Sequence, residues 1–257
     1  MGRSFFKYQA TGNDFILVDN RSNLFPKKDT KTVAQLCHRR FGIGADGLIL
    51  LETDKSTDFR MVYYNSDGRE GSMCGNGGRC IVAFAKYLGL IEDSCNFTAI
   101  DGPHEAHIRD GKIALKMKDV TEIHDTRKYL WLDTGSPHHV QLWEPWEELD
   151  VPREGARLRY GLYGSGGSNI NFVHPAGDNR FEVRTYERGV EAETYSCGTG
   201  VTAVALGMHH LGRLSGTSAQ ITTRGGALQV RFSKGPEGYS DIWLEGPAEL
   251  VFKGELP

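Results

Sequence analysis

Two cysteines in similar surroundings are the residues of this sequence whose types and spacing best suit chemistry. Cys74 is followed by Gly75-Asn76-Gly77 and Cys197 by Gly198-Thr199-Gly200, and each glycine-rich turn leads into an apolar run long enough for a helix. A cysteine beside the first turn of a helix lies near unpaired N–H groups and the positive end of the helix dipole, which favours the thiolate. The glycines remove side-chain bulk, so a small anion could approach the bare amides.

Two helix starts of this kind, facing each other, would hold one carboxylate with a sulfur on either side. One sulfur would remove a proton from one face of the carbon next to the carboxylate, and the other would return a proton to the opposite face. The helix amides would stabilise the enolate-like charge that develops in between. The pattern therefore predicts proton transfer by two thiols at a carbon α to a carboxylate.

Three other interpretations of the cysteines remain open. A lone free cysteine is usually a buried apolar residue, but two at equivalent positions of a repeat favour chemistry. A redox disulfide has no C-x-x-C motif to support it, and its thiols would come from separate halves. A metal site is disfavoured because Cys74 and Cys80 are six residues apart and the histidine pairs 138–139 and 209–210 are adjacent rather than helically spaced. We expect neither a metal nor a cofactor.

The similarity between the two cysteine segments extends along the chain. Leu88-Gly89 matches Leu211-Gly212 at the same offset as the cysteines, 123 residues, and Thr11-Gly12-Asn13 matches Thr134-Gly135-Ser136. Phe59–Asn65 resembles Phe181–Glu187 at an offset of 122. This spacing predicts two similar halves. We place a first domain at residues 1–120, which contains Cys74, and a second at 121–249, which contains Cys197.

The elements that would position the cysteines are strands and a few helices, a mixed α/β composition. Helices are expected at 32–41, 75–88 and 198–211, and the principal strands at 5–9, 15–19, 48–52, 59–64, 169–174 and 181–186. The polar, proline-bearing stretch 144–157 receives no element. Residues 42–47 spell G-x-G-x-x-G, but they follow a helix and precede a strand, the reverse of the order in dinucleotide sites. A tight turn is the better interpretation.

Composition excludes several classes of partner. The 257 residues carry a net charge of −3 without a cluster of Lys and Arg, so no nucleic acid is expected. No apolar run approaches the roughly 20 residues that span a bilayer, and the N-terminal segment lacks a signal region. Five cysteines without such a signal fit free thiols in a reducing compartment. We expect a cytoplasmic protein.

Several polar residues lie on loops that the repeat brings near the cysteines, and Arg188 among them suits a second carboxylate. Any one of these residues could instead be a turn residue or a surface charge. The set comprises Asn13, Asn65, His138, Asn169, Glu187 and Arg188.

With these residues in view, the sequence closely resembles the diaminopimelate epimerases, cofactor-independent two-cysteine enzymes that invert one α-carbon of diaminopimelate in lysine and peptidoglycan biosynthesis. The resemblance covers nearly the whole chain. It rests on the segments 11–15, 42–47, 65–68, 73–77, 135–138, 169–172, 187–189 and 196–200.

The resemblance implies a role for each of these residues. Cys74 and Cys197 would be the acid/base pair, supported by His138 and Glu187, which would also meet the reacting amino group. Gly75-Asn76 and Gly198-Thr199 would hold the carboxylate at the reacting centre. The distal amino-acid end of the substrate would be held by Asn13, Asn65, Asn169 and Arg188.

The family fold that this implies is two pseudo-symmetric α/β halves, each a curled mixed sheet around a central helix, with the substrate in the cleft. The last residues, 250–257, would return to the first half, and the protein would be a homodimer. Two departures bear on how the substrate is held. Gly47 stands where many members have Gln, which removes a substrate-side interaction or leaves its place to water, and Ser136 stands where Asn is usual.

The competing functions follow from the same residues. Proline racemases and hydroxyproline epimerases share the fold and the two-cysteine logic, so a racemase or epimerase of another amino acid is the first alternative. From other classes come a thiol–disulfide redox enzyme and a non-catalytic amino-acid-binding module. The asparagines together with Arg188 favour a long substrate with two amino-acid ends.

Overall fold

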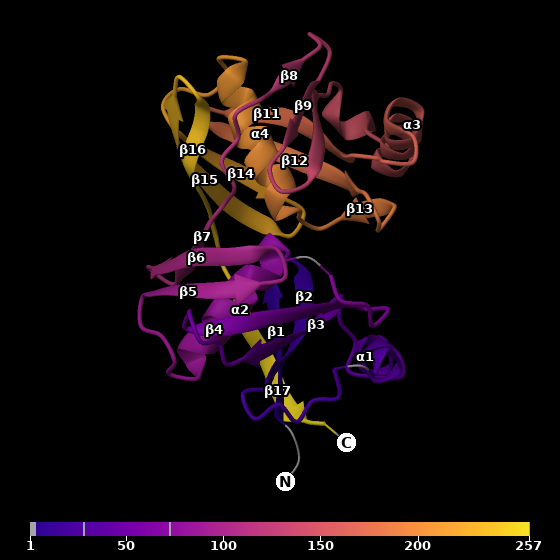
Figure 1. Cartoon of the computed structure of the whole chain (residues 1–257). Helices are drawn as coiled ribbons and strands as arrows, with labels where there is room; N and C mark the ends of the chain where they lie inside the picture. Colours follow the sequence, from indigo (N-terminus) through magenta and orange to yellow (C-terminus); the bar gives the residue numbers. More distant parts are fainter. Residues whose placement is uncertain (1–3, 28, 72, 257) are drawn as a thin grey trace. The chain divides into compact units, whose positions relative to one another are not determined.

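The computed structural model describes residues 4–27, 29–71 and 73–256 (Figure 1). The chain divides into two compact units, one made of Met1–Leu115 with Gly246–Pro257 and the other of Lys116–Glu245. The boundaries expected from the sequence lie a few residues further along, at 120/121 and 249/250. The outer ends of the first expected domain, residues 1–3 and 257, lie outside the described ranges.

The first unit is a mixed sheet. From β1 to β7 successive strands are neighbours, with β2–β3 and β4–β5 parallel and the other pairs antiparallel, and β17 lies antiparallel to β1. The strands are β1 (Ser4–Ala10), β2 (Asn13–Asp19), β3 (Gly47–Glu52), β4 (Phe59–Asn65), β5 (Ser94–Ala99), β6 (Gly102–Arg109), β7 (Lys112–Lys116) and β17 (Glu249–Glu255).

The second unit repeats this order of pairings. From β9 to β12 and on through β14 to β16, the pairs β10–β11 and β12–β14 are parallel and the others antiparallel. Its strands are β8 (His124–Asp125), β9 (Leu130–Asp133), β10 (Pro137–Leu142), β11 (Asn169–Gly177), β12 (Arg180–Glu187), β13 (Ala192–Thr194), β14 (Ser218–Thr223), β15 (Gly226–Gly235) and β16 (Gly238–Gly246). The expected pair of similar α/β halves is confirmed.

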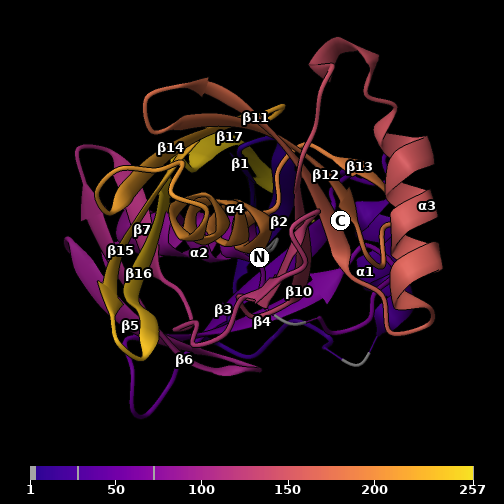
Figure 2. The same cartoon turned by 90° about the horizontal axis from the view of Figure 1, so that it is seen from above.

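Each unit has one central helix, α2 (Gly75–Tyr87) in the first and α4 (Gly198–His210) in the second. Ten of the thirteen residues of each are buried. A helix that is apolar nearly all round must be covered on every side. Figure 2 shows strands β11, β12, β14, β15 and β16 around α4, and α2 packs against β1, β2 and β3.

The matching sets of strands, β1 to β7 and β9 to β16, are each connected to a further strand that pairs with the first strand of a set. After β7, the short β8 pairs with β9, the first repeat strand of the second unit. After β16, β17 pairs with β1, the first strand of the first unit. The C-terminal segment therefore lies with the N-terminal strands, as its yellow colour beside indigo shows in Figure 1.

Two helices differ from the sequence-based expectation. Helix α1 (Thr30–Cys37) ends four residues before Phe41, because His38 turns to an extended conformation and residues 42–45 fold back onto the carbonyls of the last turn. Helix α3 (Val151–Tyr163) was not predicted. It begins at the cap Asp150 and packs on β11 and β12, so tertiary contacts outweigh the weak helix propensity of its glycines.

The G-x-G-x-x-G segment is the expected tight turn. The amides of Ile43 and Gly44 both donate to Leu36 O, and that of Ala45 donates to Cys37 O, so the segment caps α1 and leads into β3. Gly44 has φ +81°, a conformation that glycine adopts at little cost. None of the helices in the described part of the chain has the length and apolar character that a membrane crossing requires.

Candidate active site

Cys74 occupies the N-cap of α2. Its backbone is extended, with φ −108° and ψ 139°, and its sulfur accepts a hydrogen bond from Gly77 N at 3.4 Å. The side chain is half-buried. A sulfur in the N-cap position meets the orphan N–H groups and the positive end of the dipole, both of which stabilise negative charge.

The turn between β1 and β2 brings Asn13 to the sulfur. Thr11 and Gly12 both have positive φ, the conformation of a two-residue hairpin turn. The Cys74 thiol donates to Asn13 Oδ1 at 3.6 Å, and Asn76 Nδ2 donates to the same oxygen at 3.2 Å. Asn13 Nδ2 donates to Asp46 Oδ2 at 2.6 Å, which fixes the orientation of the amide.

A network of charges holds the Asn13 turn against the turn that precedes β3. Asp14 pairs with Lys7 at 2.6 Å and with Arg39 at 2.7 Å, and Arg39 also reaches Asp46 at 2.7 Å. Burial would raise the pKa of Asp14, but the bonds from Arg39 and Lys7 outweigh it and lower that pKa to about 2. The carboxylate therefore stays ionised, and the two turns are joined at neutral pH.

Arg79 lies one turn into α2 and is completely buried. Its guanidinium donates to Asn76 Oδ1 at 2.9 Å, to Thr11 Oγ1 at 3.1 Å and to Pro247 O at 3.2 Å. It thus ties the helix start to the Asn13 turn and to the segment that leads into β17. This residue was not predicted to belong to the site, although a charge inside an apolar run was the available signal.

Asn65 and Gly47 lie opposite each other on β4 and β3. Asn65 is exposed, and its carbonyl accepts from Gly68 N at 2.9 Å to close the turn after β4. A Cβ on Gly47 would lie 2.5 Å from Cε2 of Tyr63, so the ring of Tyr63 fills the space beside this glycine. The structure therefore places Asn65 and Gly47 together on neighbouring strands, beside Tyr63, which the sequence pattern did not indicate.

Cys197 is the N-cap of α4 and repeats the backbone of Cys74, with φ −126° and ψ 110°. It is 9% exposed, and its sulfur lies 3.5 Å from Thr199 Oγ1. The Thr199 carbonyl accepts from Thr134 Oγ1 at 2.8 Å, which fastens the first turn of the helix to the end of β9.

A chain of hydrogen bonds runs from β11 to Cys197 through His138. Asn171 Nδ2 donates to His138 Nδ1 at 3.1 Å, so the ring carries its proton on Nε2 and donates from there to Thr199 Oγ1 at 2.9 Å. Burial lowers the pKa of His138 to about 3, so the ring is neutral. The Thr199 hydroxyl is then able to donate to the sulfur of Cys197.

A second group in this unit surrounds Arg188. Arg188 N donates to Asn169 Oδ1 at 2.8 Å, and its guanidinium donates to Gly166 O at 3.0 Å and reaches Ser136 Oγ at 3.5 Å. Asn169 Nδ2 donates to Pro137 O at 3.2 Å. Glu187 precedes Arg188 at the half-buried end of β12.

The structure thus groups most of the predicted residues by unit. Cys74, Gly75, Asn76 and Asn13 form one cluster. Cys197, Gly198, Thr199 and His138 form another, joined through β10 to Asn169, Arg188 and Ser136. Asn171, which sets the tautomer of His138, lies in the 169–172 motif but was not assigned a role. The roles of all these residues stay predictions.

None of the five cysteines, all of which lie in the described ranges, forms a disulfide. Among the described residues, no group of three or more His, Cys, Asp and Glu side chains is placed to hold a metal ion. Burial raises the pKa of Cys37 and of Cys95 to about 12, in keeping with core thiols.

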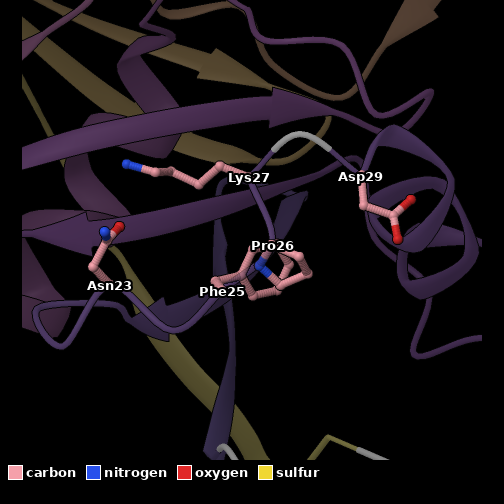
Figure 3. A pocket seen from close by; sticks show the side chains of 5 residues that line it. All are labelled: Asn23, Phe25, Pro26, Lys27 and Asp29. Atoms are coloured by element: carbon pink, nitrogen blue, oxygen red, sulfur yellow. The ribbon is translucent and has the colours of Figure 1, made fainter.

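Two surface hollows in the described part of the chain are lined by other residues than these clusters. One of about 630 Å³ is lined by Asn23, Phe25, Pro26, Lys27 and Asp29 (Figure 3), and another of about 450 Å³ by residues of the second unit, from Pro175 to Arg213. Neither is lined by a predicted site residue. In Figure 3 the Lys27 and Asp29 side chains point apart rather than toward a common centre, so we assign this hollow no role.

Comparison with known proteins identifies relatives of this chain. A family model described as diaminopimelate epimerase matches residues 5–124 and 130–251. The chain belongs to the diaminopimelate epimerase family. It is 55% identical to the diaminopimelate epimerase of Flavobacterium psychrophilum over 250 residues, 96% of this chain and 98% of that protein. It is 40% identical to that of Chlorobaculum tepidum over 258 residues, with the same coverage.

Solved structures of low identity share the fold. A phenazine biosynthesis protein from Bacillus anthracis matches with a TM-score of 0.79 at 13% identity, over 100% of this chain and 99% of that one. A probable proline racemase from Agrobacterium radiobacter matches with a TM-score of 0.69 at 13% identity, over 99% of this chain and 93% of that one. These likenesses concern the fold of this chain alone.

Proposed function

We propose that the chain is an isomerase that interconverts LL- and meso-diaminopimelate without a cofactor. The observation that carries this proposal is the family match, which extends over both halves and includes both thiol-capped helix starts. The activity supplies a precursor of lysine and peptidoglycan, as the family's role implies.

In the proposed mechanism Cys74 and Cys197 act on opposite faces of one α-carbon. A thiolate takes the α-proton, so a C–H bond breaks and an S–H bond forms. The opposite thiol gives its proton to the other face, so its S–H bond breaks and a C–H bond of inverted configuration forms. The pair carries one negative charge before and after, with the two sulfurs exchanging roles.

The α-carboxylate needs donors that stabilise the charge as the proton leaves. The first turns of α2 and α4 offer backbone N–H groups at residues outside the intrahelical ladder, at Gly75-Asn76 and Gly198-Thr199. Both residues that open these turns are glycines and are buried, which supports a close approach of a carboxylate.

The partners of Cys197 suit support of a thiolate. Because neutral His138 donates to Thr199, the Thr199 hydroxyl is turned toward the sulfur and can follow its change of charge. We infer that Glu187, at the end of β12, meets the ammonium group at the reacting centre. A carboxylate is the natural partner for that group.

The distal amino-acid end of the substrate has one carboxylate and one ammonium group. Arg188, with Asn169 on its backbone and Ser136 at its guanidinium, is the proposed partner for the carboxylate. Asn13 and Asn65 are proposed as amide contacts. Ser136 already lies at hydrogen-bond distance from Arg188, so its shorter side chain is compatible with this role.

We further infer a cytoplasmic homodimer, as the family resemblance implies. Cysteines without disulfides fit the compartment. Three consecutive exposed apolar residues of β17, Leu250, Val251 and Phe252, support a contact between copies. Light scattering on the wild type and on Val251→Glu tests this, and a monomeric wild type would refute it.

The experiment that tests the function is incubation of the pure protein with LL-diaminopimelate in deuterated water, without added cofactor. We expect one deuterium at the α-carbon together with conversion to the meso isomer. If diaminopimelate shows no exchange but another amino acid in a panel does, that amino acid is the substrate instead. Activity that requires alternate oxidation and reduction of the two thiols would show that the protein is a thiol–disulfide redox enzyme instead.

A further inference from the structure

The two central helices start alike but differ in charge at one equivalent position. Arg79 and Thr202 are 123 residues apart, the offset of the cysteines, and both are completely buried. Arg79 Nη1 donates to Gly75 O at 3.3 Å, and Thr202 Oγ1 donates to Gly198 O at 3.0 Å. The two side chains thus bond to equivalent carbonyls. One brings a positive charge and the other a hydroxyl.

Among the described residues, no carboxylate forms an ion pair with the guanidinium of Arg79. Its hydrogen-bond partners are three oxygens of Gly75, Thr11 and Asn76 and the carbonyl of Pro247, all of them uncharged. Burying a charge in this way is costly, and burial accordingly lowers the pKa of Arg79 to about 10. A nearby anion would offset that cost.

The guanidinium of Arg79 donates to Gly75 O and Asn76 Oδ1, on the two residues that follow Cys74. The ionisable groups that interact with its charge are the thiols of Cys80 and Cys74. Cys80 is completely buried, and burial raises its pKa far above the usual range, so it remains a thiol. Cys74 is half-buried at the helix start and accepts from Gly77 N. Of the two groups, Cys74 is the one able to supply the negative charge.

The other charges around α2 come in balanced pairs. Lys7 of β1 pairs with Asp14 of β2, and Arg39, in the loop between α1 and β3, bridges Asp14 to Asp46 in the same loop. Burial raises the pKa of Tyr8 to about 12, so this residue of β1 is neutral. The remaining carboxylates of the packed strands each have a cation: Asp19 with Arg21, and Glu52 with Lys27.

The corresponding start of α4 has neutral groups inside it. Thr199 and Thr202 are neutral, and His138 is neutral because burial lowers its pKa to about 3. His139, also on β10, has a pKa lowered to about 4 by burial. Asp133 and Arg188 act on His138 with opposite signs. Glu187 lies 122 residues after Asn65 and is its equivalent in the second unit, where a carboxylate replaces a neutral amide.

Resting on the proposed function, we propose that Arg79 is a positioning residue that holds Cys74 as the thiolate of the resting enzyme, while Cys197 rests as the thiol. Cys74 is then the base when the resting enzyme meets a substrate, and Cys197 is the proton donor. After turnover the charge lies on Cys197, whose helix carries Thr202 in place of the buried arginine. A proton must therefore pass back to restore the resting state.

The contact of Cys74 with Asn13 Oδ1 is made by the protonated thiol, and it opposes ionisation. It is a neutral contact to sulfur at 3.6 Å, whereas Arg79 brings a full charge inside a buried region. A full charge in a low-dielectric interior acts beyond direct contact, whereas a neutral hydrogen bond acts only at contact distance. The balance at Cys74 therefore favours the thiolate.

The test is the pH dependence of alkylation of each cysteine in the full chain without substrate, read by isotope-labelled iodoacetamide and peptide mass spectrometry. We compare the pH midpoints of alkylation rather than its absolute rates, because Cys197 is the less exposed thiol and burial slows its alkylation. We expect the midpoint of Cys74 to lie about one pH unit or more below that of Cys197, a tenfold difference in thiolate fraction. A lower midpoint for Cys197 in the wild type overturns the proposal, and this arm needs no variant.

Three variants test the cause. Arg79→Gln should raise the midpoint of Cys74 without moving that of Cys197, and Arg79→Lys should restore it. Thr202→Ser, at the equivalent position, should leave both midpoints unchanged. A folded Arg79→Gln with an unchanged Cys74 midpoint overturns the assignment. Because no substrate is present, a low midpoint at Cys74 in a protein that fails to exchange diaminopimelate would reject the proposed function and leave this proposal standing.

Discussion

The ring of Tyr63 lies in the space that a side chain at Gly47 would occupy. A Cβ on Gly47 would come within 2.5 Å of Tyr63 Cε2 and 3.1 Å of Tyr63 Oη, and one on Gly71 within 2.9 Å of Tyr63 Cε1. The ring thus spans two glycines, and its edge packs on Phe15 with ring centroids 6.0 Å apart. The tyrosine ring therefore occupies the place beside Gly47, and the loss of a substrate-side interaction at this position stays a prediction.

Introducing a long side chain at Gly47, without another substitution, should therefore destabilise the protein. Gly47→Gln must displace the Tyr63 ring and also meets the backbone oxygen of Tyr64, 2.5 Å from the added Cβ. We expect a loss of roughly 1–3 kcal/mol in the free energy of unfolding. Gly47→Gln with Tyr63→Ala should recover part of that loss, measured by urea denaturation. Gly161→Ala is the control, since nothing lies within 4 Å of its added Cβ and a glycine inside a helix is unfavourable. A fully stable Gly47→Gln would show that the ring is not held there.

The equivalent glycines in the first turns of the two central helices should respond differently to alanine. A Cβ on Gly200 would lie 2.4 Å from Asn171 Oδ1, whereas one on Gly77 would meet the flexible ends of Ile49 and Met61 at 3.2 and 3.4 Å. Gly200→Ala should displace Asn171 and with it the hydrogen bond that sets the His138 tautomer. We expect the turnover of this variant to fall about tenfold more than that of Gly77→Ala, measured by deuterium exchange. Equal losses of turnover in Gly200→Ala and Gly77→Ala would show that the tautomer of His138 does not affect the reaction.

Removal of either proposed catalytic thiol should abolish inversion. Cys74→Ala and Cys197→Ala should each lower kcat for epimerisation by on the order of 10²–10⁴-fold, the usual contribution of a positioned acid or base. Cys95→Ala is the matched control, because its thiol is buried in the core of the first unit and should affect stability alone. Near-wild-type inversion by either catalytic variant would refute the two-base mechanism.

Acidification should destabilise the protein through His138. Its pKa of about 3 in the folded state lies below the value of 6.5 for a free histidine, so the unfolded chain binds the proton more readily. This contribution is complete above about pH 6.5 and decreases as the pH falls toward 3. It should amount to about 2 kcal/mol lost by pH 5.

Urea unfolding at pH 7 and pH 5 measures this loss. His138→Gln should show a smaller difference between the two pH values than the wild type, with the remainder including His139, whose pKa is also lowered. The exposed His124→Gln variant is the control and should keep the wild-type difference. An unchanged difference in His138→Gln would mean that the ring takes up a proton in the folded protein.

Much of the architecture could be predicted from local patterns. The 123-residue offset predicted two similar halves, and the glycine-rich turn before each apolar run predicted α2 and α4 with a cysteine at each start. These features are local, because cap residues and hydrophobic runs act within one or two turns of chain. Helix α3 could not be predicted in the same way, since its stability comes from packing on β11 and β12.

The sequence by itself determined the duplication, the family resemblance and the pair of thiols, because residue types and their spacing are enough to define them. Only the tertiary structure decided which groups surround each thiol. It placed Tyr63 at Gly47, set the tautomer of His138 through Asn171, and buried Arg79 among uncharged oxygens at one helix start. Those contacts join residues distant in the chain. The charge of each thiol depends on such neighbours and on their burial, which spacing does not encode.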